Sequence, residues 1–145
     1  MKFVENAPLR GDFEIRVFRN GVEIEHYRES NMIMNSAKDA LARLVGGDGS
    51  GKTITKIGVG TNGNGPSASD VGVTNGYIKN VAGCRYPATG EACFDFTIAA
   101  GEANGLGIRE FGLICSDGTL FARRTRGLIE KAGDIDITGT WTIKF

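Results

Sequence analysis

The chain has 145 residues, which is the size of one ordinary domain, and 22 of them are glycine, about twice the usual share. Its 17 basic and 17 acidic side chains cancel, which argues against a nucleic-acid partner because such a partner requires a basic face. No apolar run approaches the ~18 residues of a membrane span, and residues 1–5 lack the apolar core of a signal peptide. We therefore expect a single domain over residues 1–145, made and assembled in a cytoplasm, with neither membrane nor nucleic acid as a partner.

The first predicted element is a β-hairpin. Apolar and charged residues alternate over residues 12–19 and again over residues 22–27, which is the period of a half-buried strand. Asn20-Gly21 lies between the two runs. This dipeptide is a strong signal for a two-residue hairpin turn, because both turn residues must adopt positive φ.

Residues 36–45 are predicted to form the one helix of the chain. Their apolar side chains recur at intervals of three and four residues and make a single stripe, which comprises Ala37, Ala40, Leu41, Leu44 and Val45. Asn35 or Ser36 can cap the first turn. Gly46-Gly47 is expected to end the helix in left-handed backbone.

The rest of the chain alternates short strands with turns. Residues 61–70 (TNGNGPSASD) are expected to be an exposed, mobile loop with nothing to bury, and residues 83–90 a further loop. Asp117-Gly118 is a second hairpin signal. Strands are predicted over residues 53–60, 77–81, 92–98, 107–115, 119–125 and 134–145. About eight strands joined by short turns predict a mainly β fold, an antiparallel β-sandwich or open barrel.

Residues 46–53 (GGDGSGKT) match the G-x-x-x-x-G-K-[ST] pattern of nucleotide-binding loops. In those loops a strand precedes the glycines and a helix follows, so that the helix N-terminus faces the phosphates. Here the predicted helix comes first and a strand follows. The loop then lies at a helix C-terminus, whose partial negative charge repels phosphate. We interpret the segment as a flexible connector and expect no nucleotide.

The remaining candidates for chemistry make no complete site. His26 is the only histidine, and it falls on the predicted inward or partly covered face of the first hairpin, with no carboxylate fixed nearby by sequence. No cluster of residues has the spacing of a zinc site or a calcium loop. Cys84, Cys93 and Cys115 are expected to be free thiols, although Cys84 and Cys93 could flank a loop and pair in an oxidising medium. We expect no catalytic residue, no cofactor and no metal.

Charged residues inside the predicted strands are the candidate interface residues. Glu110 is predicted to share one strand face with Ile108, Gly112 and Ile114, while Arg109 lies on the other face. Charges flanked by apolar residues within a strand indicate either a subunit interface or a satisfied ion pair.

A second group of charges lies on the next predicted strand. Arg124 and Arg126 share one face of that strand, and Arg123 points to the other. Three arginines are too few for a phosphate track, so we interpret them, together with Arg109 and Glu110, as interface candidates.

Several segments resemble phage virion proteins. Residues 107–124 (GIREFGLICSDGTLFARR) are similar to the I-R-E-x-G-L-x-x-x-D-G-x-L-x-A stretch of phage tail proteins, including the N-terminal attachment domains of tail fibres. Residues 22–45 resemble the opening of many small virion proteins, in which a hairpin precedes an asparagine, here Asn31, and a short helix. Residues 57–70 are similar in style to the loop between these segments. The match in residues 107–124 is carried by Ile108, Arg109, Glu110, Gly112, Leu113, Asp117, Gly118, Leu120 and Ala122.

The resemblance implies a non-enzymatic structural protein of the virion, in the tail or neck. It implies a homo-oligomer, a ring or a trimer, that binds other virion proteins through strand edges and loops. Because neither a shaft nor a receptor-binding tip follows Phe145, we expect a collar, neck, baseplate or fibre-attachment adaptor. The alternative is a carbohydrate-binding or host-attachment module of the same particle, for which the aromatic candidates are Trp141, Tyr77, Tyr86 and Tyr27.

Overall fold

The computed structural model describes residues 9–145, which form nine strands and one helix. In chain order the elements are β1 (Arg10–Arg19), β2 (Val22–Ile33), α1 (Asn35–Gly46), β3 (Ile54–Gly60), β4 (Tyr77–Asn80), β5 (Gly83–Arg85), β6 (Glu91–Ile98), β7 (Gly107–Cys115), β8 (Leu120–Glu130) and β9 (Ile135–Lys144). The prediction of a mainly β fold with one short helix is confirmed. The ninth strand, β5, falls in a segment that the sequence predicts to be a loop. Over residues 9–145, the structure contains no helix of the length and apolar character needed to span a membrane.

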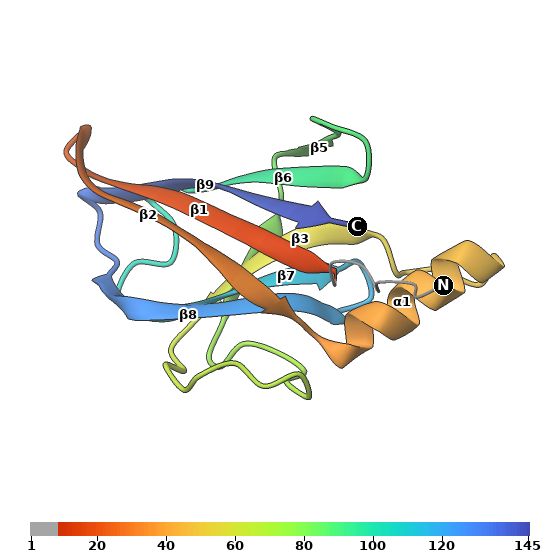
Figure 1. Ribbon diagram of the computed structural model, residues 1–145. Coiled ribbons are helices and arrows are strands. Elements are labelled where there is room, and N and C mark those ends of the chain that lie inside the picture. The colour runs from red at the N-terminus through yellow and green to blue at the C-terminus, as the bar shows by residue number, and fades with distance from the viewer. Residues whose placement is uncertain (1–8) are drawn as a thin grey trace, which may run out of the picture.

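The strands form two antiparallel sheets that share β2, as in a β-sandwich (Figure 1). One sheet has the order β5-β6-β9-β1-β2 and the other the order β2-β8-β7-β3-β4. β2 pairs with β1 from Val22 to Asn31. Its last two residues, Met32 and Ile33, then pair with Arg123 and Ala122 of β8.

β2 and β8 diverge from this meeting point (Figure 1). We call the stretch in which these two strands lie beside each other without pairing the seam. The seam lies between residues 22–30 of β2 and residues 124–130 of β8. Within the described residues, neither stretch pairs with a strand on the side that faces the seam. Each therefore presents an open backbone edge.

The opposite edge of the sandwich is closed by the chain itself, where it passes from β4 to β5. Val81 donates its backbone N–H to the carbonyl of Thr55 in one sheet (2.9 Å), and Ala82 donates to Asp95 in the other (2.7 Å). The ammonium of Lys79 in β4 reaches across as well. These contacts give this edge internal partners, in contrast to the seam.

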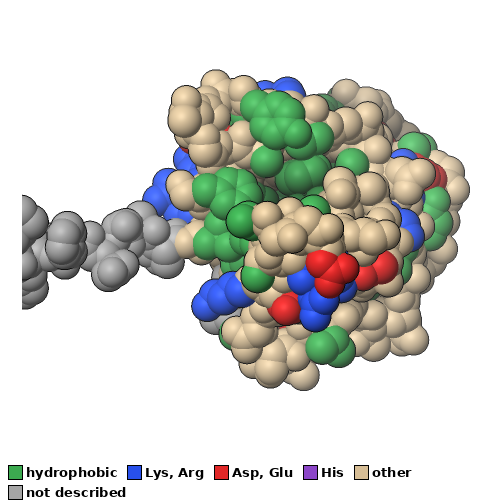
Figure 2. Space-filling model, turned by 90° about the vertical axis from the view of Figure 1, so that its right-hand side faces the viewer, with side chains coloured by type: hydrophobic (Ala, Val, Ile, Leu, Met, Phe, Trp, Pro, Cys, Tyr) green, Lys and Arg blue, Asp and Glu red, His purple; other side chains and the backbone are tan. Residues whose placement is uncertain are grey.

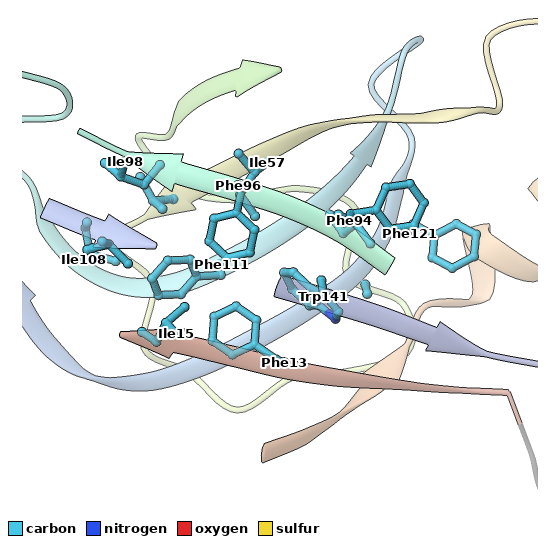
Figure 3. Packing of buried hydrophobic residues seen from close by; sticks show 14 of the residues in the cluster. Phe13, Ile15, Ile57, Phe94, Phe96, Ile98, Ile108, Phe111, Phe121 and Trp141 are labelled. Carbon is cyan, nitrogen blue, oxygen red and sulfur yellow. The ribbon is translucent and has the colours of Figure 1, made fainter. Parts of the chain in front are cut away.

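The core lies between the two sheets and centres on four aromatic rings (Figure 3). The ring centroid of Phe13 lies 4.8 Å from that of Trp141, 4.9 Å from that of Phe111 and 6.1 Å from that of Phe96. Trp141 is fully buried, and its indole N–H donates to the side-chain oxygen of Asn31 at 2.8 Å. Successive side chains of a strand point to opposite faces, so the alternation that predicts the strands also predicts which side chains enter this core.

The two predicted hairpins are both present. Asn20 and Gly21 adopt φ values of 49° and 80°, as the two-residue turn requires. In the second hairpin only Gly118 has positive φ, at 95°, and its N–H donates to the carbonyl of Cys115 at 2.9 Å. The second turn therefore has three residues, with glycine at the left-handed position.

Helix α1 begins at Asn35, one residue before the predicted range. The residue that precedes it, Met34, is extended, and no side chain caps the first turn. The expected cap by Asn35 or Ser36 is wrong, because the hydroxyl of Ser36 donates instead to the carbonyl of Leu120 in β8. Gly47 ends the helix with φ 84°, as predicted.

Candidate functional site

The polar centre of the molecule is a buried ion pair between β7 and β8. The Nε of Arg123 donates to Oε1 of Glu110 at 2.8 Å, and the two side chains are 2% and 0% exposed. The register of the two strands shifts between Ile108 and Glu110. Because of this shift Ile108 lies in the core while Glu110 lies on the outer face of its sheet, so their predicted shared face is wrong. The sequence left two interpretations open for Glu110, and the structure shows a satisfied ion pair, with Arg123 as the partner.

The loop between β3 and β4 (residues 61–76), which we call the covering loop, lies over this ion pair. Glu110 Oε2 accepts the backbone N–H groups of Asn62 (2.8 Å) and Thr74 (2.9 Å). Arg123 Nη2 donates to the carbonyl of Asn62 at 2.9 Å. Both side chains thus bind the backbone of the loop as well as each other, which satisfies the hydrogen bonding that buried charges require.

Asp70 adds a second carboxylate from the covering loop. Its Oδ2 accepts from Nη1 of Arg123 at 2.9 Å and from the backbone N–H of Ser67 at 2.8 Å. The expectation that residues 61–70 have nothing to bury is therefore wrong, because this segment helps to cover two charged side chains. The composition of this segment predicts a loop, but it does not reveal that Asp70 binds Arg123, which lies 53 residues away in the chain.

Two glycines allow the covering loop to approach the sheet. A Cβ atom on Gly60 would lie 2.6 Å from Oε2 of Glu110 and 2.6 Å from the carbonyl oxygen of Thr74. A Cβ atom on Gly112 would lie 2.9 Å from the side chain of Val73. A side chain at either position would push the loop away from the ion pair.

Arg124 and Arg126 lie on the opposite face of β8 from Arg123, as predicted, and both reach across the seam to β2. Arg124 donates to the hydroxyl of Tyr27 (2.8 Å) and to the carbonyl of Ser30 (2.9 Å), and Arg126 forms an ion pair with Glu25. Their guanidinium carbons lie 5.7 and 5.1 Å from the centroid of the Tyr27 ring, within cation–π range. These side chains therefore fill part of the seam and cover Tyr27.

Arg109 is exposed, whereas the other four interface candidates are buried or partly buried. Its side chain lies against the covering loop, since a Cβ atom on Gly63 would be 3.1 Å from its Cδ. The five candidates do not form one cluster. The structure divides them between the covering loop and the seam.

The segment that matches a nucleotide-binding loop supports the β7–β8 hairpin instead. Helix α1 precedes residues 46–53 and β3 follows, which is the predicted order. Lys52 Nζ lies 2.8 Å from a carboxylate oxygen of Asp117 and donates to the hydroxyl of Thr119 at 3.1 Å. The hydrogen bond from Lys52 is the main reason that the pKa of Asp117 falls well below its usual range. A phosphate would have to displace this ion pair.

His26 is exposed and hydrogen-bonds the carboxylate of Glu14 on the neighbouring strand. The sequence predicts His26 on the inward or partly covered face, but Tyr27 takes the inward position, and the carboxylate beside His26 comes from the neighbouring strand. In the part of the chain that the structure describes, no group of three or more His, Cys, Asp or Glu side chains is arranged to hold a metal ion.

Cys84 and Cys93 are free, and their places in the β5–β6 pair keep them apart. Cys84 lies directly opposite Phe94, and Cys93 lies opposite Arg85. Two residues that pair across neighbouring strands point to the same face of the sheet, and successive residues of one strand point to opposite faces. Cys84 therefore shares a face with Phe94, and Cys93 points to the other face. Cys115 is buried, and burial raises the pKa of its thiol to about 11, which keeps it protonated and unreactive.

A polar cluster at the closed edge has no signal in the sequence pattern. The carboxylate of Glu102 accepts hydrogen bonds from Lys79 (2.7 Å), from the hydroxyl of Tyr77 (2.8 Å) and from the backbone N–H of Ala99 (2.8 Å). The hydrogen bond from Lys79 is the largest cause that lowers the pKa of Glu102 to about 2. The cluster joins β4 to the loop after β6 and so closes this edge of the sandwich.

Comparisons with known proteins return no match. No family model, curated protein or solved structure matches this chain.

Proposed function

We propose that this protein is a structural component of a phage virion, in the tail or neck. It assembles with copies of itself and binds other virion proteins as a collar, neck, baseplate or fibre-attachment adaptor. The observation that carries the proposal is the seam, where two strand edges have no strand partner within the described residues. Open edges of this kind pair readily with another chain.

Apolar side chains line the open end of the seam. Val22 is 66% exposed, Ile24 51% and Leu128 43%. Ile24 and Leu128 border a hollow of about 320 Å³ that also contacts Ile129. A strand from another copy that paired here would cover these side chains and also satisfy the backbone edge.

The charges on the two sides of the seam favour a second copy of this chain as the partner. Residues 22–30 carry three glutamates against one arginine, whereas residues 124–130 carry Arg124 and Arg126 against Glu130. Within one chain Arg126 is already paired with Glu25, so β2 of one copy complements β8 of the next only when this ion pair is exchanged for the equivalent pair between copies. A head-to-tail contact of this type closes into a ring when the rotation between copies allows it.

Two of the three segments that resemble virion proteins, residues 57–70 and 107–124, meet at the covering loop. The segments that resemble virion proteins contribute Asp70, Glu110 and Arg123, and these three side chains form one hydrogen-bonded network. Residues 57–70 and 107–124 therefore belong to a single structural unit, the β7–β8 hairpin with its covering loop.

The carbohydrate-binding alternative requires exposed aromatic rings in a groove. Trp141 is fully buried, Tyr27 lies beneath two arginines and Tyr77 is partly buried with its hydroxyl bound to Glu102. Among the four aromatic candidates, Tyr86 is the one with a largely exposed side chain, at 77%. These positions favour assembly over sugar binding, and we expect no signal from this protein on a glycan array.

Sedimentation velocity over a range of protein concentrations tests the assembly. We expect the unmodified chain to form a discrete oligomer. Ile24→Lys and Leu128→Lys place a charge in the seam and should shift the chain to monomer. Val71→Lys, at an 82% exposed position on the covering loop, is the matched control and should assemble normally.

A monomer at every concentration would argue against assembly through the seam, as would oligomers that are unaffected by the two seam variants. Mass spectrometry of purified phage particles that encode the chain tests the location. The proposal requires the chain among the virion proteins, at a copy number that fits a ring around the tail axis.

A further inference from the structure

An apolar surface lies at the end of the sandwich where α1 packs, and it contains two adjoining hollows. One hollow, of about 170 Å³, is bordered by Leu44 of α1, Phe94 of β6 and Phe145. The other, of about 310 Å³, is bordered by Tyr86 and Phe145. Figure 2 looks onto this end of the molecule and shows hydrophobic side chains gathered around a hollow. Phe94 belongs to the core, so the core reaches the surface here.

Large apolar side chains project around these hollows. Val45, in the last turn of α1, is 90% exposed, and Tyr86, which follows β5, is 77% exposed. Leu44 and Phe145 are 42% and 63% exposed. Apolar side chains that gather on one surface and are continuous with a core are typical of a binding site.

The charge of this surface favours a partner that carries the same surface. Among the described residues that line the two hollows, Lys52 and Glu91 are the charged ones, and their charges are opposite. Lys52 forms an ion pair with Asp117 at 2.8 Å. Glu91 lies 3.9 Å from Lys144. A surface that meets an identical copy must avoid a net charge, because like charges repel across an interface. A strongly acidic or basic partner, in contrast, would find no complementary charge here.

The shape of the surface also suits contact with its own copy. A contact about a two-fold axis places one patch against the same patch of the partner, so the patch must carry both a projection and a hollow. Val45 and Tyr86 are the projections. An apolar cavity of about 150 Å³ holds one benzene molecule. The hollow of about 170 Å³ therefore has room for one apolar side chain of the other copy.

The proposed ring presents this surface from every copy on the same side. The seam runs along the strands, so contacts through it leave the two ends of each sandwich on the two faces of the ring (Figure 1). Rotation about the ring axis relates all copies and places every α1 end on one face. Two rings can therefore meet through all of these surfaces at once.

We propose that two such rings bind face to face, and that the apolar surface at the α1 end of each copy contacts the same surface of a copy in the other ring. This inference rests on the proposed assembly through the seam. The two hollows are lined by fewer residues than the ~20–30 a side of a stable interface, so one contact does not hold two single copies together. Repetition of the contact around the ring makes the binding of the two rings strong.

Sedimentation velocity and electron microscopy of the full chain test this contact. We expect the unmodified chain to form a two-layered particle with an even number of copies. Leu44→Lys places a charge in the apolar surface, and Phe145→Ala removes an exposed ring from it. Each variant should halve the mass of the particle and give a one-layered ring. Ala42→Lys, at an exposed position of α1 that lines neither hollow, is the matched control and should keep both layers.

The possible outcomes separate this inference from the proposed function. A one-layered ring of the unmodified chain would overturn the face-to-face contact, would leave assembly through the seam intact and would assign the apolar surface to a different protein. Two layers that persist in both Leu44→Lys and Phe145→Ala would also overturn the contact. A monomeric unmodified chain would instead overturn the ring itself, and this inference with it.

Discussion

Arg123 and Arg126 lie three residues apart on β8, yet they occupy opposite environments. Arg123 is 2% exposed, and its Nε, Nη1 and Nη2 each donate to an oxygen of Glu110, Asp70 or Asn62. Arg126 spans the seam, where its own side chain is 8% exposed, its ion-pair partner Glu25 is 37% exposed and the backbone edges have no strand partner. Alternation along the strand places one arginine under a loop and the other beside a gap. The first is needed for the domain itself, whereas the second lies where another chain can bind.

Removal of Arg123 should have the largest effect. We expect Arg123→Ala to lower the free energy of unfolding by about 3–5 kcal/mol, because Glu110 would remain as a buried charge without its partner. Urea denaturation followed by the fluorescence of Trp141 measures this change. The covering loop should also lose its anchor, which hydrogen exchange at the amides of Asn62 and Thr74 would report.

Arg124→Ala is the matched control on the other face of β8. It removes contacts at a partly buried position, so we expect a cost of only about 1 kcal/mol. If Arg123→Ala costs no more than Arg124→Ala, the ion pair does not hold the covering loop. Replacement of both Arg123 and Glu110 by methionine should recover much of the loss, since no buried charge then lacks a partner.

Replacement of a glycine next to the ion pair should lower the free energy of unfolding by a smaller amount. Gly60→Ala would bring a Cβ atom to 2.6 Å from the carboxylate of Glu110 and from the carbonyl of Thr74. We expect a loss of about 1–3 kcal/mol, the usual cost of overpacking. Gly65→Ala is the control in the same loop, because no atom lies within 4 Å of its Cβ position. Equal melting temperatures for the two variants would mean that the loop moves away at no cost.

The sequence predicts the strands and the first hairpin well because their signals are local. Alternation over residues 12–19 identifies the buried face of β1, and Asn20-Gly21 identifies its turn. The predicted order of helix, glycine-rich loop and strand around residues 46–53 is also the order in the structure. Each of these inferences depends on residues that are close together in the chain.

The site is harder to predict because its partners are distant in sequence. Glu110 and Arg123 can be recognised as unusual charges within strands, but that they meet on the outer face depends on an irregularity in the pairing of β7 with β8. Asp70 joins them from a loop whose composition suggests exposure. The seam arises because β2 leaves one sheet for the other at Met32, and no local pattern marks that crossing.

The closed edge is a third region to compare. Its contribution to stability should depend on pH, because the pKa of Glu102 is lowered there. The pKa of Glu102 is lowered to about 2, so its hydrogen bonds stabilise the fold fully above the ordinary carboxyl pKa. This stability is lost as the pH falls from about 5 to about 2. We expect Glu102→Gln to cost about 1–2 kcal/mol at pH 7 and much less near pH 2, where the carboxyl group becomes protonated. Urea denaturation at both pH values measures the difference, and a cost that is the same at both would exclude the ionised carboxylate as its source.

The smallest effect is expected in the seam, and a double-mutant cycle compares it directly with the buried pair. Arg126 and Glu25 interact at a partly solvated position, so their coupling free energy should be about 0.5–1 kcal/mol. The corresponding cycle for Arg123 and Glu110 should give a value several times larger. Arg126→Lys keeps the charge but loses the planar contact with Tyr27, so it should retain the ionic part of the coupling alone. Equal coupling free energies in the two cycles would mean that Arg126 and Glu25 stabilise the seam as much as the buried pair stabilises the covering loop. A strand from another chain would then have to break a strong interaction to enter the seam, which would argue against the seam as a binding site.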